Sequence, residues 1–130
     1  MDPSCPLCAA ADSRECLLAT KNAVAIFDAY PVSPGHALVV SKRHVAHLFE
    51  LSVDEQRSLW ALLPAVKKAI ESRYSPAGYN IGVNVGIAAG QTVGHVHVHV
   101  IPRYEGDSDD PRGGVRWVLP ARADYWSGRG

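Results

Sequence analysis

The sequence has no long apolar run and no excess of charge of either sign. Its apolar residues never reach the roughly 18 consecutive positions that a membrane-spanning helix needs, and the N-terminal MDPSCPLC lacks the basic flank and apolar stretch of a secretion signal. We therefore expect a protein of the cytoplasm with no membrane partner. Lysine plus arginine and aspartate plus glutamate both number 13, so no overall field attracts nucleic acid and an anionic ligand must be held by local groups.

Cysteine is scarce, with Cys5, Cys8 and Cys16 only. An odd number of cysteines without a secretion signal argues against a disulfide framework. The CxxC spacing of Cys5 and Cys8 has three interpretations: half of a zinc site, a redox pair, or a turn without chemistry. A redox pair usually opens a helix after a strand, and no strand is expected before Cys5, so a zinc half-site is favoured. Cys16 is expected to be a small apolar filler.

The length of 130 residues fits one domain, residues 1–130, with a core of its own. The β-rich segments 22–28 and 36–41, on either side of a loop with proline and glycine, predict two antiparallel strands. A third strand is predicted over 79–85. Because strands precede and follow one long helix, the pattern indicates an α+β fold with an antiparallel sheet.

The helix is predicted over about 53–73. Ser52 and Glu55 form a capping box at its start. Apolar residues then recur at helical spacing, namely Leu59, Leu62, Leu63, Val66 and Ile70. Pro64 lacks a backbone donor, so we expect a kink near it or two shorter helices.

From residue 104 to residue 130 the sequence predicts an extended tail with no regular element. Trp117, Tyr125 and Trp126 are large aromatic residues in this otherwise polar segment. Such residues are seldom left in water. They are expected to pack on their own domain or against a second subunit, and the subunit contact is favoured.

The run GHVHVHV, residues 94–100, alternates valine with histidine. Alternation is typical of a half-buried strand, which places Val96, Val98 and Val100 toward a core and the histidines at 95, 97 and 99 on the opposite face. The outer two histidines lie roughly 13 Å apart along a strand, whereas two ligands of one zinc ion bring their nitrogens within about 4 Å. One metal cannot easily hold all three, so at least one imidazole is left to act as nucleophile, general base or phosphate donor. The alternatives are a chance surface pattern and a pair of metal ligands.

The connector before this run, GIAAGQTVG, favours an anion cradle. Gly86, Gly90 and Gly94 allow the backbone to turn N–H groups toward a phosphate. The side chains of Asn84, Gln91 and Thr92 can donate to phosphate oxygens. A plain glycine-rich turn would explain the glycines but not these three polar residues together.

The stretch GQTVGHVHVHVIPR, residues 90–103, resembles the signature of the histidine triad superfamily. Residues 27–45, FDAYPVSPGHALVVSKRHV, are similar to the strand, proline loop and second strand of that family's nucleotide pocket. The resemblance covers about residues 5–104, and GQTV with HVHVHVIPR is similar to the fragile histidine triad branch. It implies an antiparallel sheet of about five strands with one long helix, paired into a homodimer.

The same resemblance implies the roles of individual residues. His97 would attack the α-phosphate of a nucleotide to form a covalent nucleotidyl-histidine that water cleaves. His99 would hold an α-phosphate oxygen, and His36 would support the triad by hydrogen bonding. The implied nucleotide-binding residues are Ile26, Phe27, Asp28, Asn84, Gly90, Gln91 and Thr92.

A structural zinc site is also implied, because bacterial-type members carry a CxxC pair that joins two histidines. The matching ligands here are Cys5, Cys8, His44 and His95, a Cys2His2 set. His47 is the rival of His44. Catalysis would then need no cofactor.

The function predicted is hydrolysis or transfer at the α-phosphate of a dinucleoside polyphosphate, with release of a nucleoside monophosphate. An adenosine phosphoramidase and a non-catalytic nucleotide-binding regulatory module remain alternatives. A metalloenzyme that uses His95 and His97 on a catalytic metal is a further alternative. A DNA deadenylase is disfavoured because no basic surface excess is visible.

Overall fold

A computed structural model of the chain describes residue 2, residues 4–12 and residues 16–128. In chain order its elements are α1 (Pro6–Ala11), β1 (Leu18–Ala19), β2 (Ala23–Phe27), β3 (Ala37–Ser41), η1 (Leu48–Glu50), α2 (Val53–Ala61), α3 (Leu63–Glu71), β4 (Gly78–Gly82), η2 (Ile87–Ala89), β5 (His97–Arg103), η3 (Gly114–Val118) and α4 (Pro120–Ala123). Among the described residues, no helix has both the length and the apolar character that crossing a bilayer requires.

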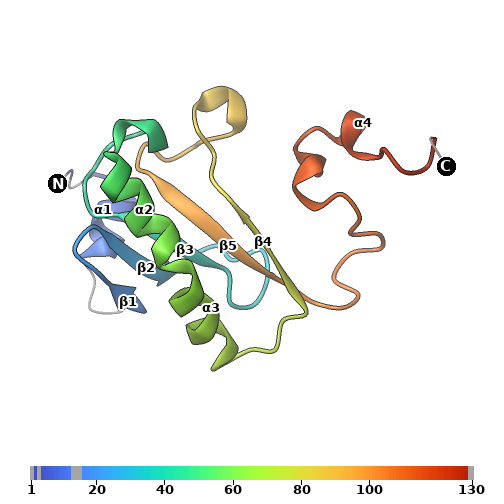
Figure 1. Cartoon of the computed structure of the whole chain (residues 1–130), viewed down its shortest axis with the longest axis horizontal. Helices are drawn as coiled ribbons and strands as arrows, with labels where there is room; N and C mark the ends of the chain where they lie inside the picture. Colours follow the sequence, from blue (N-terminus) through green and yellow to red (C-terminus); the bar gives the residue numbers. More distant parts are fainter. Residues whose placement is uncertain (1, 3, 13–15, 129–130) are drawn as a thin grey trace.

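Five strands form one sheet in the order β1-β2-β3-β5-β4, and every neighbouring pair is antiparallel (Figure 1). The predicted α+β fold with an antiparallel sheet is confirmed. The predicted strands at 22–28, 36–41 and 79–85 correspond to β2, β3 and β4. The pattern did not predict β1, because two residues are too few to show an alternation.

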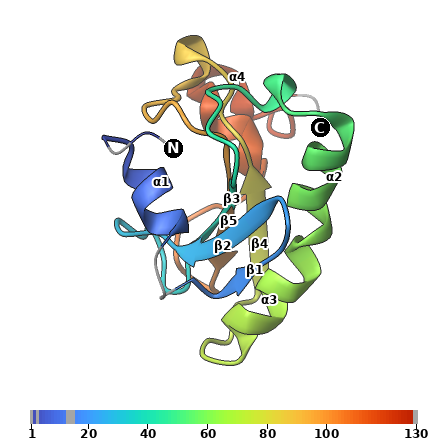
Figure 2. The same ribbon diagram turned by 90° about the vertical axis from the view of Figure 1, so that its left-hand side faces the viewer.

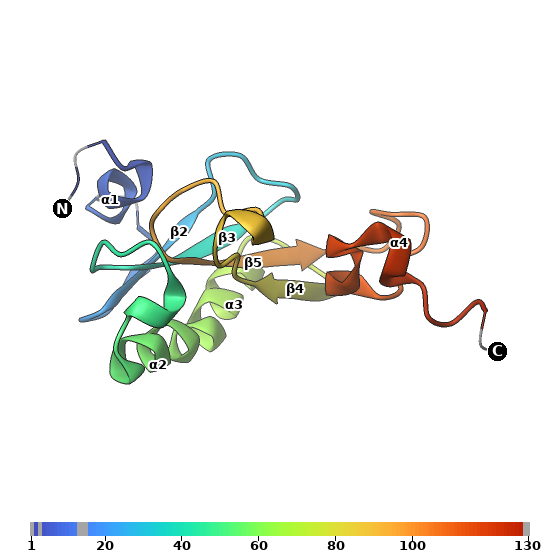
Figure 3. The same cartoon turned by 90° about the horizontal axis from the view of Figure 1, so that it is seen from above.

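The two faces of the sheet are covered differently. Helices α2 and α3 lie on one face and the short helix α1 lies on the other, as Figure 3 shows from above. Figure 2 shows the same arrangement, with the sheet between α1 on the left and α2 and α3 on the right. Side chains that alternate along a strand therefore enter two separate apolar clusters, one on each face.

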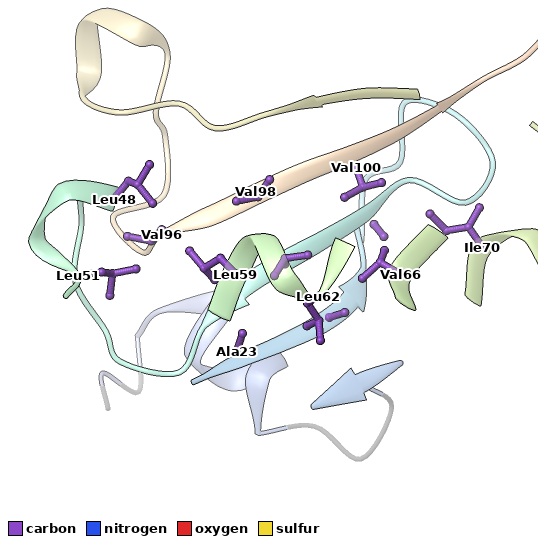
Figure 4. Close-up of a cluster of buried hydrophobic side chains, with 13 residues drawn as sticks. Ala23, Leu48, Leu51, Leu59, Leu62, Val66, Ile70, Val96, Val98 and Val100 are labelled. Carbon is purple, nitrogen blue, oxygen red and sulfur yellow. The ribbon is translucent and has the colours of Figure 1, made fainter. Parts of the chain in front are cut away.

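The larger cluster lies between the sheet and α2 and α3 (Figure 4). Val96, Val98 and Val100 are 1 %, 0 % and 2 % exposed, which confirms the predicted core face of the histidine run. They share this cluster with Leu59 and Val66 of the helices. The opposite face of the same strand is thereby left to carry histidines.

The predicted helix is present and bent. Ser52 caps α2 by accepting from the Glu55 N–H, and the Glu55 side chain accepts from the Ser52 N–H, as the capping box predicts. The segment divides into α2 and α3 at Leu62, just before Pro64. Since Pro64 has no N–H to donate to the preceding turn, the break falls where the sequence predicted it.

The predicted tail contains two short helices, η3 and α4, and lies apart from the helix-covered part of the sheet (Figure 1); residues 129–130 lie outside the described residues. The aromatic residues of the tail contact other residues of the tail. The Trp117 indole donates to the Arg112 carbonyl oxygen at 2.6 Å, and the Arg112 guanidinium lies over the Trp126 ring. Tyr125 and Trp117 nevertheless remain 52 % and 43 % exposed, so packing within the tail buries them only in part.

Candidate active site

His97 lies on β5 with one ring nitrogen fixed by the backbone. Its Nδ1 atom is 2.7 Å from the carbonyl oxygen of His95. A carbonyl oxygen can only accept, so Nδ1 carries the proton and Nε2 of the neutral ring keeps a free lone pair. The ring is half-buried on the face opposite the valines. This arrangement suits a nucleophile held on a rigid strand.

His99 and His36 are linked across β5 and β3. The backbone N–H of Val32 donates to His36 Nδ1 at 3.1 Å, so the proton of the neutral His36 ring lies on Nε2. That Nε2 is 3.0 Å from His99 Nδ1, which must accept. The proton of the neutral His99 ring then lies on its Nε2. The hydrogen bonds from Val32 to His36 and from His36 to His99 therefore leave His99 with a donor at Nε2. The ring centroids of His99 and His97 are 5.0 Å apart, so this donor lies on the same face as the free lone pair of His97.

Burial favours the neutral form of both supporting imidazoles, His36 and His99. Burial lowers the pKa of His36, and the opposing effect of the Asp28 charge is smaller. Burial also lowers the pKa of His99, and the neighbouring His97 lowers it further. We call the hydrogen bonds from the Val32 N–H to His36 and from His36 to His99 the relay. Each ring of the relay accepts at Nδ1 and must therefore be neutral, so the lowered pKa values favour the tautomers that the hydrogen bonds assign.

The three predicted residues at the end of β2 do not share one environment. Ile26 is buried in the cluster on the histidine face, whereas Phe27 packs with the helix-side cluster, edge-on to Tyr74. The Asp28 carboxylate accepts from the Tyr30 N–H at 2.9 Å and lies 3.4 Å from His36 Nε2. It therefore stabilises the turn after β2 and faces the histidine pair. The predicted base and ribose contacts of these residues stay predictions.

The glycine-rich connector contains two turns that need glycine. Gly86 and Gly90 have φ of 91° and 92°, in the left-handed region that side chains disfavour. The N–H groups of residues 92, 93, 94 and 95 have no hydrogen-bond acceptor among the described residues. The side chains of Asn84 and Thr92 likewise have no hydrogen-bond partner in the part of the chain that the structure describes. The phosphate contacts that the sequence predicts for this connector stay predictions.

The predicted metal ligands Cys5, Cys8, His44 and His95 are brought together, with one ligand atom from each within 4.8 Å of all the others. Cys8 Sγ lies 3.2 Å from His44 Nδ1 and 3.4 Å from His95 Nδ1, and the two nitrogens are 3.1 Å apart. Tetrahedral zinc with ordinary bond lengths holds two nitrogens about 3.3 Å apart and a sulfur and a nitrogen about 3.5 Å apart. The donor set and its spacing therefore fit zinc.

The surroundings of this cluster also fit a metal. His95 is fully buried, and its Nε2 lies 2.7 Å from the Ser41 carbonyl oxygen, which leaves Nδ1 free of a proton to act as a ligand. Burial raises the pKa of the Cys8 thiol, and a bound cation would oppose this by stabilising the thiolate. His47 is exposed and outside the cluster. His95 lies just before β5 and beneath α1, so it does not share the half-open surface of His97 and His99 that alternation predicted.

A second group with metal-ligand spacing is formed by Asp28, His36 and His99. Here the Val32 N–H already donates to His36 Nδ1, so Nε2 carries a proton and offers no lone pair to a cation. The geometry of this group favours the hydrogen-bonded relay.

Sequence patterns missed the groups that set these tautomers, namely the Val32 N–H and the carbonyl oxygens of Ser41 and His95. They belong to the backbone, and no residue type marks them. The cavities of about 500 and 560 Å³ along the tail were not predicted either, and none of the six histidines lines them.

Comparison with known proteins identifies a family that the chain matches. The sequence profile of the HIT domain matches residues 11–106. The asymmetrical bis(5'-nucleosyl)-tetraphosphatase of Schizosaccharomyces pombe is 42 % identical over 88 residues, which cover 68 % of this chain and 48 % of that protein. This chain thus spans about half the length of that relative.

Two solved structures are similar over most of the chain. A HIT family protein from Bacillus anthracis has a TM-score of 0.72 and 32 % identity, and the match covers 80 % of this chain and 76 % of that one. A zinc-bound histidine triad family protein from Mycobacterium smegmatis has a TM-score of 0.71 and 30 % identity, with 91 % and 92 % covered.

Proposed function

The chain belongs to the histidine triad (HIT) family, and on that premise we propose that it cleaves dinucleoside polyphosphates at the α-phosphate and releases a nucleoside monophosphate. The observation that carries the proposal is the hydrogen bond from His97 Nδ1 to the His95 carbonyl oxygen, which leaves the lone pair on Nε2 free to attack. The similarity to a nucleosyl tetraphosphatase supports the choice of substrate class.

The proposed reaction has two steps. His97 Nε2 forms a bond to the α-phosphorus, and the bond from that phosphorus to the bridging oxygen breaks, so that the rest of the polyphosphate leaves with the bonding pair. Water then attacks the nucleotidyl-histidine, gives up a proton, and releases the monophosphate while His97 recovers its lone pair. The His99 Nε2–H donates to a non-bridging oxygen as charge develops on it. The free N–H groups of residues 92–95 are the proposed cradle for the phosphate chain.

The test is a His97→Asn variant. We expect turnover of diadenosine tetraphosphate to fall by about a thousandfold or more, because the nitrogen lone pair of the asparagine amide is delocalised into its carbonyl group and is not nucleophilic. Binding of adenosine monophosphate should stay measurable, since the cradle is intact. Turnover at the wild-type rate would refute the proposal. Assaying an adenosine phosphoramidate in parallel identifies the preferred leaving group, which the pocket beyond the α-phosphate sets.

Zinc is proposed as a structural ion held by Cys5, Cys8, His44 and His95, with no part in the phosphoryl transfer. It would anchor α1, which begins at Pro6, to the start of β5. The zinc-bound relative from Mycobacterium smegmatis supports this assignment.

A homodimer is also proposed. β4 is an edge strand with one side unpaired within the described sheet, and Tyr125 and Trp117 of the tail remain half exposed. A monomer in light scattering at micromolar concentration would contradict it. The cytoplasmic location stays a prediction from the sequence.

A further inference from the structure

Gln91 makes all three of its side-chain hydrogen bonds to backbone groups. Its Oε1 accepts from the Gly86 N–H at 2.9 Å, while Nε2 donates to the carbonyl oxygens of Ala46 at 2.6 Å and Val93 at 2.9 Å. A flipped amide would place Oε1 against two carbonyl oxygens, so only this orientation satisfies the contacts. Both amide hydrogens are therefore in use, and none is left for a phosphate.

These bonds join three parts of the chain. Gly86 and Val93 lie in the first and second halves of the loop between β4 and β5, and Ala46 follows β3 in the segment that carries His44. The Gln91 N–H also donates to the Gly86 carbonyl oxygen at 3.1 Å, which closes the loop on itself. At the tip of the loop, the N–H groups of Ala89 and Gly90 donate to the carbonyl oxygens of Gly86 and Ile87, and the Ile87 side chain is 91 % exposed. The Gln91 side chain thus fixes the loop to the body of the protein.

The groups that follow Gln91 are those of the proposed cradle. The N–H groups of residues 92–95 follow directly after Gln91 and have no acceptor among the described residues. The last of these residues, His95, accepts the hydrogen bond from His97 Nδ1 with its carbonyl oxygen. Thr92 and Gly94 also line a cavity of about 300 Å³ together with Gln91. Because the Val93 carbonyl is held by Gln91, the direction of the neighbouring N–H groups depends on this side chain.

We propose that Gln91 is a positioning residue that does not touch the substrate and instead holds the backbone donors of residues 92–95 in place for its phosphates. This inference rests on the proposed function. It replaces the direct phosphate contact that the sequence suggested for Gln91 with support of the loop from behind. The expected ligand of the supported donors is the phosphate chain of a nucleotide.

The first test is the order of the loop without ligand. In Gln91→Ala we expect faster amide hydrogen exchange over residues 86–95 than in the wild-type protein, because the loop loses three bonds. Gln56 provides a matched control, since its amide donates to the Leu51 carbonyl oxygen at 3.1 Å on the helical side of the sheet. Gln56→Ala should leave exchange in this loop unchanged. Unchanged exchange in Gln91→Ala as well would overturn the proposal and favour a direct contact.

The second test is kinetic. We expect Gln91→Ala to lower kcat for diadenosine tetraphosphate on the order of 10- to 100-fold, as misplaced donors stabilise the transition state poorly, with a smaller change in KM. Gln56→Ala should keep the wild-type kcat. A loosened loop with unchanged kcat would refute a role in catalysis.

The third test uses Gln91→Glu. A protonated carboxyl group restores one donor and one acceptor, whereas a carboxylate faces two carbonyl oxygens. The ratio of Gln91→Glu to Gln91→Ala activity should therefore rise as the pH is lowered from about 8 to about 5. A constant ratio would contradict the proposal. An inactive wild-type protein would refute the proposed function, while an unchanged loop would refute the role of Gln91, so the two failures are read from different measurements.

Discussion

The backbone carbonyl of His95 accepts a hydrogen bond from His97 Nδ1 while the His95 imidazole lies in the Cys2His2 cluster. One residue therefore contacts His97 with its main chain and the other three members of the cluster with its side chain. Its position is fixed further by the hydrogen bond from Nε2 to the Ser41 carbonyl oxygen. The order of the cluster and the orientation of His97 are expected to depend on each other.

Removal of metal should first lower stability and then activity. We expect Cys5→Ser to lose zinc and to melt at a lower temperature than the wild-type protein, since α1 is no longer tied to His95. kcat should fall less than in His97→Asn, because the strand still presents the nucleophile. Metal analysis, thermal unfolding and steady-state assays measure the three effects.

The control for this prediction is the pair of histidines at 44 and 47. His44→Asn should lose metal as Cys5→Ser does, whereas His47→Asn should retain it, because His47 lies outside the cluster. Full metal content in His44→Asn would show that the ligand set is wrong.

Replacement of His36 should alter the tautomer of His99. In His36→Ala the His99 Nδ1 loses its donor, so the proton can move to Nδ1 and Nε2 no longer donates to phosphate. We expect kcat to fall about 10- to 100-fold, as for other residues that orient a reacting group. Nitrogen-15 NMR of the imidazoles reports the tautomer directly.

His36→Gln supplies the matched comparison, since a glutamine amide can still donate to His99. It should recover part of the kcat lost in His36→Ala. Equal activity in both variants, with His99 still protonated at Nε2, would mean that His36 does not set the tautomer.

The free energy of unfolding should depend on pH because the buried His36 and His99 titrate differently in the folded and unfolded chain. Burial lowers the pKa of both histidines in the folded protein below the unfolded value of about 6.5. Between the folded pKa values and about 6.5, the unfolded chain therefore binds more protons than the folded protein. The free energy of unfolding should therefore rise with pH through that window, be fully present above about 6.5, and be lost as the pH falls toward the folded values.

Denaturant titrations at several pH values measure this slope. A double His36→Gln and His99→Gln variant removes the two titrating groups while it leaves His95 and the metal cluster in place. Its slope below about pH 6.5 should be shallower than that of the wild-type protein. An identical slope would show that the pair does not titrate in this window.

Much of the fold could be predicted from local patterns. The capping box at Ser52, the break before Pro64 and the buried valines at 96, 98 and 100 all follow from the period of a helix or strand. Two features of the fold could not be predicted from periodicity. The short β1 carried no pattern, and the tail formed two small helices where the sequence suggested none.

The candidate site divides in the same way. Residue types and spacing, read with the family resemblance, supplied the histidine face and the Cys2His2 set that the structure gathers. Spacing could not show that His95 is buried beneath α1, or which of the two apolar clusters Ile26 and Phe27 each enter. Burial depends on which elements pack over a strand, and that is decided by contacts between distant parts of the chain.

The sequence by itself determined which side chains are present on each face, because backbone geometry repeats with a fixed period. Only the tertiary structure decided what those side chains can do. The proton of His99 is placed by His36, which is 63 positions away, and the amide of Gln91 is occupied by Ala46, which is 45 positions away. Hydrogen bonds are short and directional, so a tautomer or a free donor is settled only when the folded chain brings its partner within reach.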